Sequence, residues 1–440
     1  MTHYSLKKTL FAAFLSFTAM NTYAQFGEQD ADSKYGTELI RAGEAVPSLK
    51  LKTLDGKKFQ LDKLKGKYVV LDFWGSWCPD CRKDLPNLKR MYERFHPFGI
   101  EFVGVSFDTD ANAWQDAVKK FDIPYVQVGD LKKKNESPVA QDFGVKWIPS
   151  LYLINPEGRV EVATVLSDKI ENRLYELTAP SAKPVQKKET VHIDGAKGQL
   201  TGIIQCPELK PGETCPMVIF CHGFGGSKEG PLFEITADSL AAHGIASIRF
   251  DFNGHGESEG DFQGMTVPNE IEDAKHVIEY VRDLRYVDGM ALVGHSQGGV
   301  VASMTAGELC ADDIKCVVLM APAAVLREDA IRGNTMGVTY DPLDPPEYVE
   351  LWGGKKLGRD YIKTAFSLPI YETAAKYKGP ALIVHGTADR VVPYTYGERY
   401  HQIWPGSTLV ILDGFDHGFS QNVYRTDEIV SQYLIKQLKP

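Results

Sequence analysis

A serine between two glycines is the pattern in this chain that points most directly to chemistry. Gly294-His-Ser-Gln-Gly298 follows the apolar run 290–293 and precedes the helix-like stretch 300–304. Glycine at both ends leaves room for a sharp strand-to-helix turn that a side chain would crowd, so the hydroxyl of Ser296 would stand above a sheet edge. The N–H groups that open the helix would face an oxyanion formed there. We therefore expect Ser296 to be a nucleophile; an ordinary strand-to-helix turn is the alternative.

A base and an acid for this serine can be sought downstream, because a hydroxyl is a weak nucleophile until an oriented base takes its proton. His417 follows a strand-like apolar run in a glycine-flanked loop, and Asp389 lies in the turn after another such run. The chain order Ser, Asp, His is that of α/β-hydrolases. Asp413 and Asp416 are rivals for the acid, but either would strain the loop if it faced the ring of His417. The sequence thus favours Asp389.

An oxyanion hole needs two N–H donors, one after the serine and one in the loop after an earlier strand. His222-Gly-Phe-Gly-Gly226 follows the apolar run 218–221. The expected donors are the backbone N–H groups of Gln297 and Phe224. His222 is expected to brace this loop.

A second motif with chemical potential is Trp77-Cys-Pro-Asp-Cys81, which follows the buried-looking run 69–74 and opens a helix. A C-x-x-C motif at such a junction indicates a redox site more than a metal site. Cys78 and Cys81 can cycle between dithiol and disulfide, and the helix N-terminus favours the thiolate of Cys78. Zinc would need further ligands, which this stretch does not offer. We expect no metal and no organic cofactor.

The elements that must position these motifs form two α/β domains. Strand-like and helical patterns alternate on both sides of the proline- and charge-rich stretch 179–189, which is the expected linker. The N-terminal domain is expected over 25–178, with its core at 42–178, and a larger domain with a parallel sheet over 190–440. The expected strands are 68–73, 100–105, 150–154, 217–221, 246–250, 290–293, 316–319, 381–384 and 408–412, and helical patterns cover 85–95 and 113–121.

The N-terminus has the features of a secretory signal peptide. Lys7 and Lys8 precede the apolar run 9–20, and Asn21-Thr-Tyr-Ala24 has small residues at both cleavage-site positions, with the cut expected after Ala24. We expect residues 1–24 to be removed, which leaves an exported protein, periplasmic or secreted, without a membrane span. An uncleaved membrane anchor is the alternative.

Composition limits the class of partner. The 440 residues are 43% hydrophobic and 24% charged, as in globular proteins, and the formal net charge is −9. Such a surface repels nucleic acid and anionic lipid, so neither is expected as a partner.

Five of the seven cysteines lie outside the C-x-x-C motif. In an exported protein, Cys206 with Cys215 and Cys310 with Cys316 are candidate local disulfides, and Cys221 is expected as a buried thiol. The alternative is that all five are small packed residues.

Residues 42–178 resemble the thioredoxin superfamily, in particular the exported TlpA-like redoxins. The resemblance rests on Asp72-Phe-Trp74, Trp77-Cys-Pro-Asp-Cys81 and Trp147-Ile-Pro-Ser-Leu151. It implies that Cys78 attacks, Cys81 resolves, Pro149 is a cis-proline facing the disulfide and the buried acid Asp72 assists proton transfer.

The inner pair Pro79-Asp80 departs from the commonest Gly-Pro, and a carboxylate there should disfavour the thiolate. A domain kept for docking or stability, with an idle cysteine pair, is the alternative.

Residues 190–440 resemble α/β-hydrolases, most closely the feruloyl (cinnamoyl) esterases. The matching stretches are His222-Gly-Phe-Gly-Gly226, Phe250-Asp-Phe-Asn-Gly-His-Gly256, Met265-Thr-Val-Pro-Asn-Glu-Ile-Glu-Asp273, Gly294-His-Ser-Gln-Gly-Gly-Val-Val-Ala302 and Gly333-Asn-Thr-Met-Gly-Val-Thr-Tyr340.

The resemblance implies an inserted lid over residues 323–378 that roofs the acyl pocket. Asp329 and Tyr361 would hold the phenolic hydroxyl of the cinnamoyl group. Met336 stands where relatives have a glutamine, which leaves the preferred ring substitution open. Asp329 could instead cap or solvate a lid helix.

The motifs predict a serine esterase that works through an acyl-enzyme, and the resemblance implies that it hydrolyses hydroxycinnamoyl esters of plant cell-wall polysaccharide. The substrate would be a small-molecule or oligosaccharide ester, and the thioredoxin-like domain would act on a redox partner protein.

Three alternatives remain. The hydrolase could be a serine peptidase or a generic carboxylesterase. The chain could be chiefly a thiol-disulfide oxidoreductase whose hydrolase-like half recognises a partner. The thioredoxin-like half could also serve only to position the esterase near carbohydrate.

Overall fold

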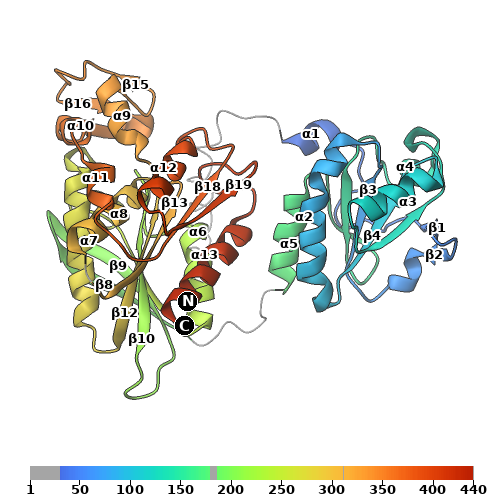
Figure 1. The fold of residues 1–440 in the computed structure, drawn as a ribbon, viewed down its shortest axis with the longest axis horizontal. Coiled ribbons are helices and arrows are strands. Elements are labelled where there is room, and N and C mark those ends of the chain that lie inside the picture. The colour runs from blue at the N-terminus through green and yellow to red at the C-terminus, as the bar shows by residue number, and fades with distance from the viewer. Residues whose placement is uncertain (1–29, 179–185, 311, 440) are drawn as a thin grey trace, which may run out of the picture. The chain divides into compact units, whose positions relative to one another are not determined.

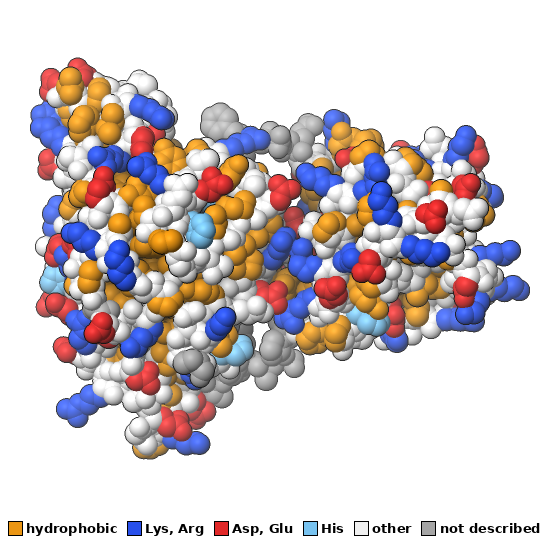
Figure 2. All heavy atoms as spheres, viewed as in Figure 1, with side chains coloured by type: hydrophobic (Ala, Val, Ile, Leu, Met, Phe, Trp, Pro, Cys, Tyr) orange, Lys and Arg blue, Asp and Glu red, His pale blue; other side chains and the backbone are white. Residues whose placement is uncertain are grey.

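The computed structural model describes residues 30–178, 186–310 and 312–439. The chain divides into two compact units, Met1–Ala179 and Pro180–Pro440 (Figure 1). The expected signal peptide, residues 1–24, and most of the expected linker, residues 179–185, lie outside the described residues. Among the helices of the described ranges, none combines the length and apolar character needed to cross a bilayer. On the face shown in Figure 2, acidic and basic side chains are interspersed over each unit.

The N-terminal unit is built on a mixed seven-stranded sheet with the order β2-β1-β5-β4-β3-β6-β7. Strands β3, β4 and β5 are parallel, and β6 and β7 continue the sheet antiparallel beside β3. The strands are β1 (Lys50–Thr53), β2 (Lys58–Gln60), β3 (Val69–Trp74), β4 (Glu101–Ser106), β5 (Val126–Gly129), β6 (Ser150–Ile154) and β7 (Val160–Thr164). The helices are α1 (Ala31–Tyr35), α2 (Pro79–Phe95), α3 (Ala111–Lys120), α4 (Pro138–Asp142) and α5 (Ser167–Thr178).

Helices α2 and α5 lie side by side on one face of this sheet, and α3 and α4 lie on the other (Figure 1). Every side chain of β3 is buried, because β3 is central and covered on both faces. This arrangement is the thioredoxin-like fold that the sequence predicted, and it places the C-x-x-C motif between β3 and α2.

The C-terminal unit contains an eight-stranded sheet with the order β19-β18-β13-β12-β10-β11-β9-β8. The six strands from β19 to β11 are parallel, and β9 and β8 are antiparallel. The strands are β8 (Gln186–Gly195), β9 (Gly198–Pro207), β10 (Cys215–Cys221), β11 (Ala246–Phe250), β12 (Val287–His295), β13 (Ile314–Met320), β18 (Ala381–Gly386) and β19 (Thr408–Leu412). The helices are α6 (Pro231–Ala242), α7 (Val267–Asp283), α8 (Gln297–Leu309), α12 (Thr395–Ile403) and α13 (Val423–Leu438).

Separate hydrophobic cores cover the two faces of this sheet. Helices α7 and α8 pack over one core, and α6 and α13 over the other (Figure 1). The arrangement is the expected α/β-hydrolase fold, and all six expected strands are present.

A large insertion separates β13 from β18. It contains α9 (Val325–Arg332), β14 (Asn334–Thr335), β15 (Val338–Thr339), β16 (Tyr348–Glu350), β17 (Lys356–Gly358), α10 (Arg359–Phe366) and α11 (Ile370–Ala374).

The linker expected over 179–189 is too long, because β8 already begins at Gln186. The first part of this edge strand, residues 187–190, is polar and exposed, so it lacks the apolar alternation by which a strand is recognised. The β8-β9 hairpin was therefore not predicted.

The two candidate disulfides outside the C-x-x-C motif are absent, since all five of these cysteines are free. Cys316 is buried in the core under α6 and α13, whereas the exposed Cys310 directs its sulfur to the carbonyl of Gly307. Cys206, near the end of β9, is a partly exposed free thiol, and Cys215, at the start of β10, is a buried one. Cys221 is a buried thiol, as expected.

Candidate active site

Ser296 occupies a sharp turn between β12 and α8, with a left-handed φ of 57°. Its N–H donates to the carbonyl of Met320 at 2.9 Å, which ties the turn to the neighbouring strand β13. A Cβ at Gly294 would lie 2.1 Å from the carbonyl oxygen of Gly298, and one at Gly298 would lie 2.1 Å from that of Cys221. Both positions therefore require glycine, for the steric reason that the motif suggested.

The structure brings Ser296, His417 and Asp389 together. His417 Nε2 lies 2.8 Å from Ser296 Oγ, and His417 Nδ1 lies 2.7 Å from Asp389 Oδ2. The other carboxylate oxygen of Asp389 accepts hydrogen bonds from the N–H groups of Val391 and Val392 at 2.8 and 2.7 Å. This is the geometry in which an acid orients a base toward a nucleophile.

Asp389 is held in its charged form although its side chain is buried. Burial raises the pKa of this carboxyl, but hydrogen bonds from His385 and His417 outweigh that effect and hold the pKa well below its usual range. The charged form is therefore available to stabilise an imidazolium at His417.

Two further histidines support the triad, and neither was predicted to do so. His385 is fully buried at the end of β18, and its Nε2 lies 3.2 Å from Asp389 Oδ2. His295 Nε2 lies 2.8 Å from the carbonyl oxygen of His417, and burial lowers its pKa to about 4, so it is neutral at physiological pH. The only signal in the sequence was position: His295 precedes the serine directly, and His385 ends the strand before Asp389.

The rival acids do not reach the ring of His417. Asp413 accepts a hydrogen bond from Thr387, and Asp416 accepts one from the backbone of Ser420.

The two expected oxyanion donors lie beside the serine. The loop after β10 runs against it closely enough that a Cβ at Gly223 would lie 2.9 Å from Ser296 Cβ. Within the described ranges, the backbone N–H groups of Phe224 and Gln297 have no protein acceptor, so both could donate to an oxyanion.

His222 braces this loop, as expected. Its Nε2 accepts a hydrogen bond from the N–H of Phe252 at 3.1 Å, and its ring packs against that of His255. His255 Nε2 in turn accepts from the N–H of Gly225 at 3.3 Å. Burial lowers the pKa of His222 to about 4, so it is not suited to act as a base near neutral pH.

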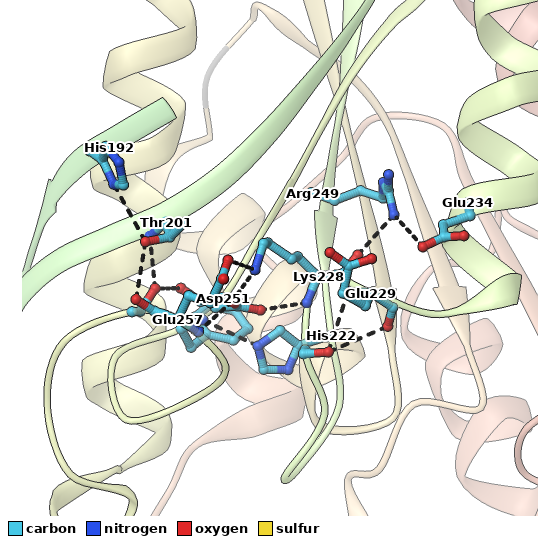
Figure 3. Close-up of polar contacts among 12 residues, drawn as sticks. His192, Thr201, His222, Lys228, Glu229, Glu234, Arg249, Asp251 and Glu257 are labelled. Atoms are coloured by element: carbon cyan, nitrogen blue, oxygen red, sulfur yellow. Dashed lines mark hydrogen bonds and ion pairs between the residues drawn. The ribbon is translucent and has the colours of Figure 1, made fainter. Parts of the chain in front are cut away.

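A buried ion pair anchors the same loop. Lys228 Nζ lies 2.8 Å from Asp251 Oδ2 and 2.7 Å from Glu257 Oε2 (Figure 3). Lys228 and Asp251 are both almost completely buried. The pair thus joins the loop after β10 to the loop after β11, and it holds the segment that presents Phe224.

A chain of buried hydrogen bonds connects the insertion to the residue after the nucleophile. The hydroxyl of Tyr361, on α10, donates to Gln297 Oε1 at 2.7 Å, and Gln297 Nε2 donates to Glu270 Oε2 at 2.8 Å. Burial raises the pKa of Glu270 to about 8, so this carboxyl is protonated at neutral pH. Because the hydroxyl of Tyr361 donates its hydrogen to Gln297, the tyrosine can offer a substrate only its oxygen, as a hydrogen-bond acceptor.

Aromatic rings from the core domain and the insertion gather around Phe224. Its ring centroid lies 5.3 Å from that of Phe262, 6.0 Å from Trp352 and 5.7 Å from Tyr361. Lys355 Nζ lies 4.8 Å from the ring centroid of Phe262. An apolar, aromatic surface with one nearby cation thus adjoins the expected oxyanion hole.

The other two expected substrate residues lie further out in the insertion. Asp329, on α9, is half-buried, and burial raises the pKa of its carboxyl to about 6. Met336 and Gly337 form the turn between β14 and β15, where both have positive φ, 52° and 84°. The half-buried Met336 side chain packs on the hydrophobic core of the unit.

The N-terminal unit brings its expected redox residues together as well. Cys78 and Cys81 are joined by a disulfide, and the N–H of Cys81 donates to Cys78 Sγ at 3.1 Å at the start of α2. Cys78 Sγ lies 3.6 Å from the carbonyl oxygen of Ile148, and the Ile148–Pro149 peptide bond is cis.

Asp72 is buried on β3, where the hydroxyl of Tyr125 donates to its Oδ2 at 3.1 Å. Burial, assisted by the charge of Asp84, raises the pKa of Asp72 to about 8. Such a group can exchange a proton near neutral pH. Within the described ranges, no cluster of three or more His, Cys, Asp or Glu side chains is placed to hold a metal ion.

Comparison with known proteins identifies relatives of each unit. The AhpC/TSA family matches residues 42–163, the family described as serine aminopeptidase, S33, matches 212–339, and the family described as TAP-like protein matches 361–440. The chain is 33% identical over 141 residues to the thiol-disulfide oxidoreductase ResA of Bacillus subtilis. The aligned residues cover 32% of this chain and 76% of that protein.

Among solved structures, the chain is similar to Est1E from Butyrivibrio proteoclasticus with ferulic acid bound. The identity is 30% and the TM-score 0.55, and the match covers 57% of this chain and 100% of that one. A second structure of Est1E gives 28% identity and a TM-score of 0.52, covering 57% of this chain and 99% of that one.

Gly298→Ala tests the steric basis of the serine turn. The added Cβ would clash with the carbonyl oxygens of Cys221 and His222, so the oxyanion loop must shift. We expect ester hydrolysis to fall roughly 100-fold, since small displacements of reacting groups cost about that much. Gly406→Ala is the matched control, because its Cβ would enter open space. Steady-state kinetics check this, and activity within twofold of the wild type would contradict it.

Glu270→Gln tests the neutral state of the buried carboxyl. An unfolded glutamate has a pKa of about 4.3, so between that value and about 8 only the unfolded chain ionises, and stability falls as pH rises. Glutamine cannot ionise, so the variant should match the wild type near pH 4 and exceed its unfolding free energy by ~4–5 kcal/mol at pH 8. Denaturant titrations measure this.

Glu272→Gln is the control, because Glu272 is exposed and paired with Lys275. If Glu270→Gln retains the pH dependence of the wild type, the buried carboxyl is not the group responsible.

Proposed function

We propose that this chain is a serine esterase acting on hydroxycinnamoyl esters. The chain belongs to the thiol-disulfide oxidoreductase family through its N-terminal domain and to the α/β-hydrolases through its C-terminal domain. The observation that carries the proposal is the hydrogen-bonded series Ser296, His417 and Asp389 in a glycine-flanked turn, at 2.8 and 2.7 Å.

The reaction would proceed by two acyl transfers. His417 Nε2 takes the proton of Ser296 Oγ as the oxygen attacks the ester carbonyl, and the N–H groups of Phe224 and Gln297 bind the oxyanion. His417 then protonates the leaving alcohol, and a water activated by the same base releases the acid from Ser296. Asp389 stabilises the imidazolium in both halves.

A hydroxycinnamate as the acyl group is supported by two observations. Est1E, the similar structure, binds ferulic acid. The surface beside Phe224 is aromatic, which suits a planar cinnamoyl ring. We propose that the insertion, residues 323–378, is the lid over this pocket.

The residues that would contact the substituents on the cinnamoyl ring lie in that lid. Asp329, with a pKa of about 6, would be ionised at neutral pH and could accept a hydrogen bond from a phenolic hydroxyl. The oxygen of Tyr361 could accept a second, and Met336 would set the preferred substitution. Esters on plant cell-wall polysaccharide carry such groups, and they are the proposed natural substrates.

A serine peptidase is the second candidate, because the family that matches residues 212–339 is described as serine aminopeptidase. A panel of feruloyl, caffeoyl, coumaroyl and sinapoyl methyl esters, short acyl esters and peptide amides distinguishes the two. Preference for the hydroxycinnamoyl esters supports the first candidate.

For the N-terminal domain we propose thiol-disulfide exchange with a partner protein in an exported setting. Cys78 would attack or be attacked, Cys81 would resolve the mixed disulfide, and Asp72 would exchange the proton. Trp77 is 55% exposed beside the disulfide and Trp147 is 38% exposed, so an apolar surface is available for a polypeptide partner.

Ser296→Ala removes the proposed nucleophile. Release of ferulate from methyl ferulate should fall by at least about 1,000-fold, while the fold is retained. Ser227→Ala, which changes a half-buried serine in the neighbouring loop, is the control and should keep wild-type turnover. Unchanged ferulate release by Ser296→Ala would end the proposal.

Cys78→Ser tests the redox activity independently of the esterase. Reduction of insulin disulfides by the dithiol-loaded protein should be lost, because the attacking thiol is gone and Cys81 alone cannot complete the exchange, while ester hydrolysis continues. Cys310→Ser, which removes an exposed thiol elsewhere, should reduce insulin as the wild type does. An idle cysteine pair would instead give no insulin reduction in the wild type either.

A further inference from the structure

Lys355 is a cation beside the candidate active site that neither proposed activity uses. It lies in the insertion directly before β17 and is half-buried. Its Nζ donates to the carbonyl oxygen of Gly225 at 3.4 Å and lies 4.8 Å from the ring centroid of Phe262. Lys355 therefore links the insertion to the loop that follows β10.

The contact with Gly225 places this charge close to the reacting carbonyl. Gly225 follows Phe224, whose N–H is an expected oxyanion donor, and Gly223 runs against Ser296. Because successive Cα atoms are about 3.8 Å apart, Nζ of Lys355 lies within roughly 11 Å of the backbone nitrogen of Phe224. A side group on an ester held at Ser296 can therefore reach the ammonium.

Within the described residues, no carboxylate neutralises Lys355. An ammonium has three N–H donors, and the one hydrogen bond to a backbone carbonyl leaves two of them for a ligand. Two acids of the neighbouring loops, Asp251 and Glu257, are engaged by Lys228 at 2.8 and 2.7 Å (Figure 3). A half-buried cation with spare donors and no paired acid is suited to bind an anionic group of a ligand.

Such an anionic group must belong to the alcohol half of the ester. The proposed hydroxycinnamoyl half is neutral near pH 7, since a phenol such as that of tyrosine has a pKa of about 10. The ionised carboxylate of Asp329, in the proposed pocket for the ring, would also repel an anion there. The alcohol half is the part of the substrate left to supply a charge.

We infer that Lys355 is a specificity-determining residue that binds a carboxylate on the alcohol half of the ester. The inference rests on the proposed esterase activity, and it names the substrates that the site prefers: hydroxycinnamoyl esters of alcohols that bear a carboxylate, such as sugar acids. Lys355 keeps its hydrogen bond to Gly225 and donates a second N–H to the carboxylate. The ring of Phe262 covers one side of the ammonium, and the partial exclusion of water strengthens the ion pair.

The test compares two feruloyl esters that differ in charge and little in shape, those of 4-hydroxybutanoate and of 4-hydroxybutanamide. In the wild type at low salt, kcat/KM should be about fivefold higher for the carboxylate ester, the effect expected of one partly exposed ion pair. Lys355→Gln should bring this ratio to about one, and Lys355→Arg should keep most of it. Added salt should reduce the ratio in the wild type, because it screens the charges.

Lys356→Gln is the matched control and should keep the wild-type ratio. This exposed neighbour is the register partner of Glu350 across β16 and β17, and its Nζ lies 4.3 Å from the ring centroid of Tyr348. A wild type that hydrolyses both esters with equal kcat/KM would overturn the inference and leave the proposed esterase standing. So would a Lys355→Gln variant that loses activity on both esters in equal proportion, since Lys355 would then only brace the loop. A wild type that hydrolyses neither ester refutes both.

Discussion

The charged carboxylate of Asp389 is the group on which the catalytic arrangement depends. A buried, unpaired carboxylate would cost several kcal/mol, so it persists only because hydrogen bonds surround it. His417 and His385 contact one oxygen, and the N–H groups of Val391 and Val392 donate to the other. Because Nδ1 of His417 is hydrogen-bonded to the carboxylate of Asp389, the other ring nitrogen, Nε2, faces the hydroxyl of Ser296. The tautomer and the orientation of the base thus follow from one buried charge.

Parallel strands supply the common edge at which these groups meet. Ser296, Asp389 and His417 follow β12, β18 and β19, and the oxyanion loop follows β10, which lies beside β12. Since the carboxyl ends of parallel strands lie at one edge, residues far apart in sequence become neighbours. In the N-terminal domain, Cys78 likewise lies between the end of β3 and the start of α2. Each domain therefore presents its reactive atom at a strand-to-helix turn.

Sequence patterns predicted these reactive residues because each belongs to a short motif with a steric or electrostatic cause, as at Gly294 and Gly298. The supporting contacts could not be predicted in the same way. The contact of His385 with Asp389 and the buried series of Glu270, Gln297 and Tyr361 arise from tertiary packing, which leaves no local periodicity. The polar edge strand β8 was missed for a related reason. Of the two alternatives for Cys310 and Cys316, the structure has free cysteines, because proximity in sequence does not fix the direction of a side chain.

The central claim, that Ser296 carries the acyl group during ester cleavage, is tested most directly by mass spectrometry of the protein quenched within its first turnover. A feruloyl ester with a good leaving group should yield a feruloyl adduct on the peptide that contains Ser296, and the adduct should disappear as ferulate is released. Cleavage of the ester with Ser296 unmodified and the acyl group on another residue would contradict the account.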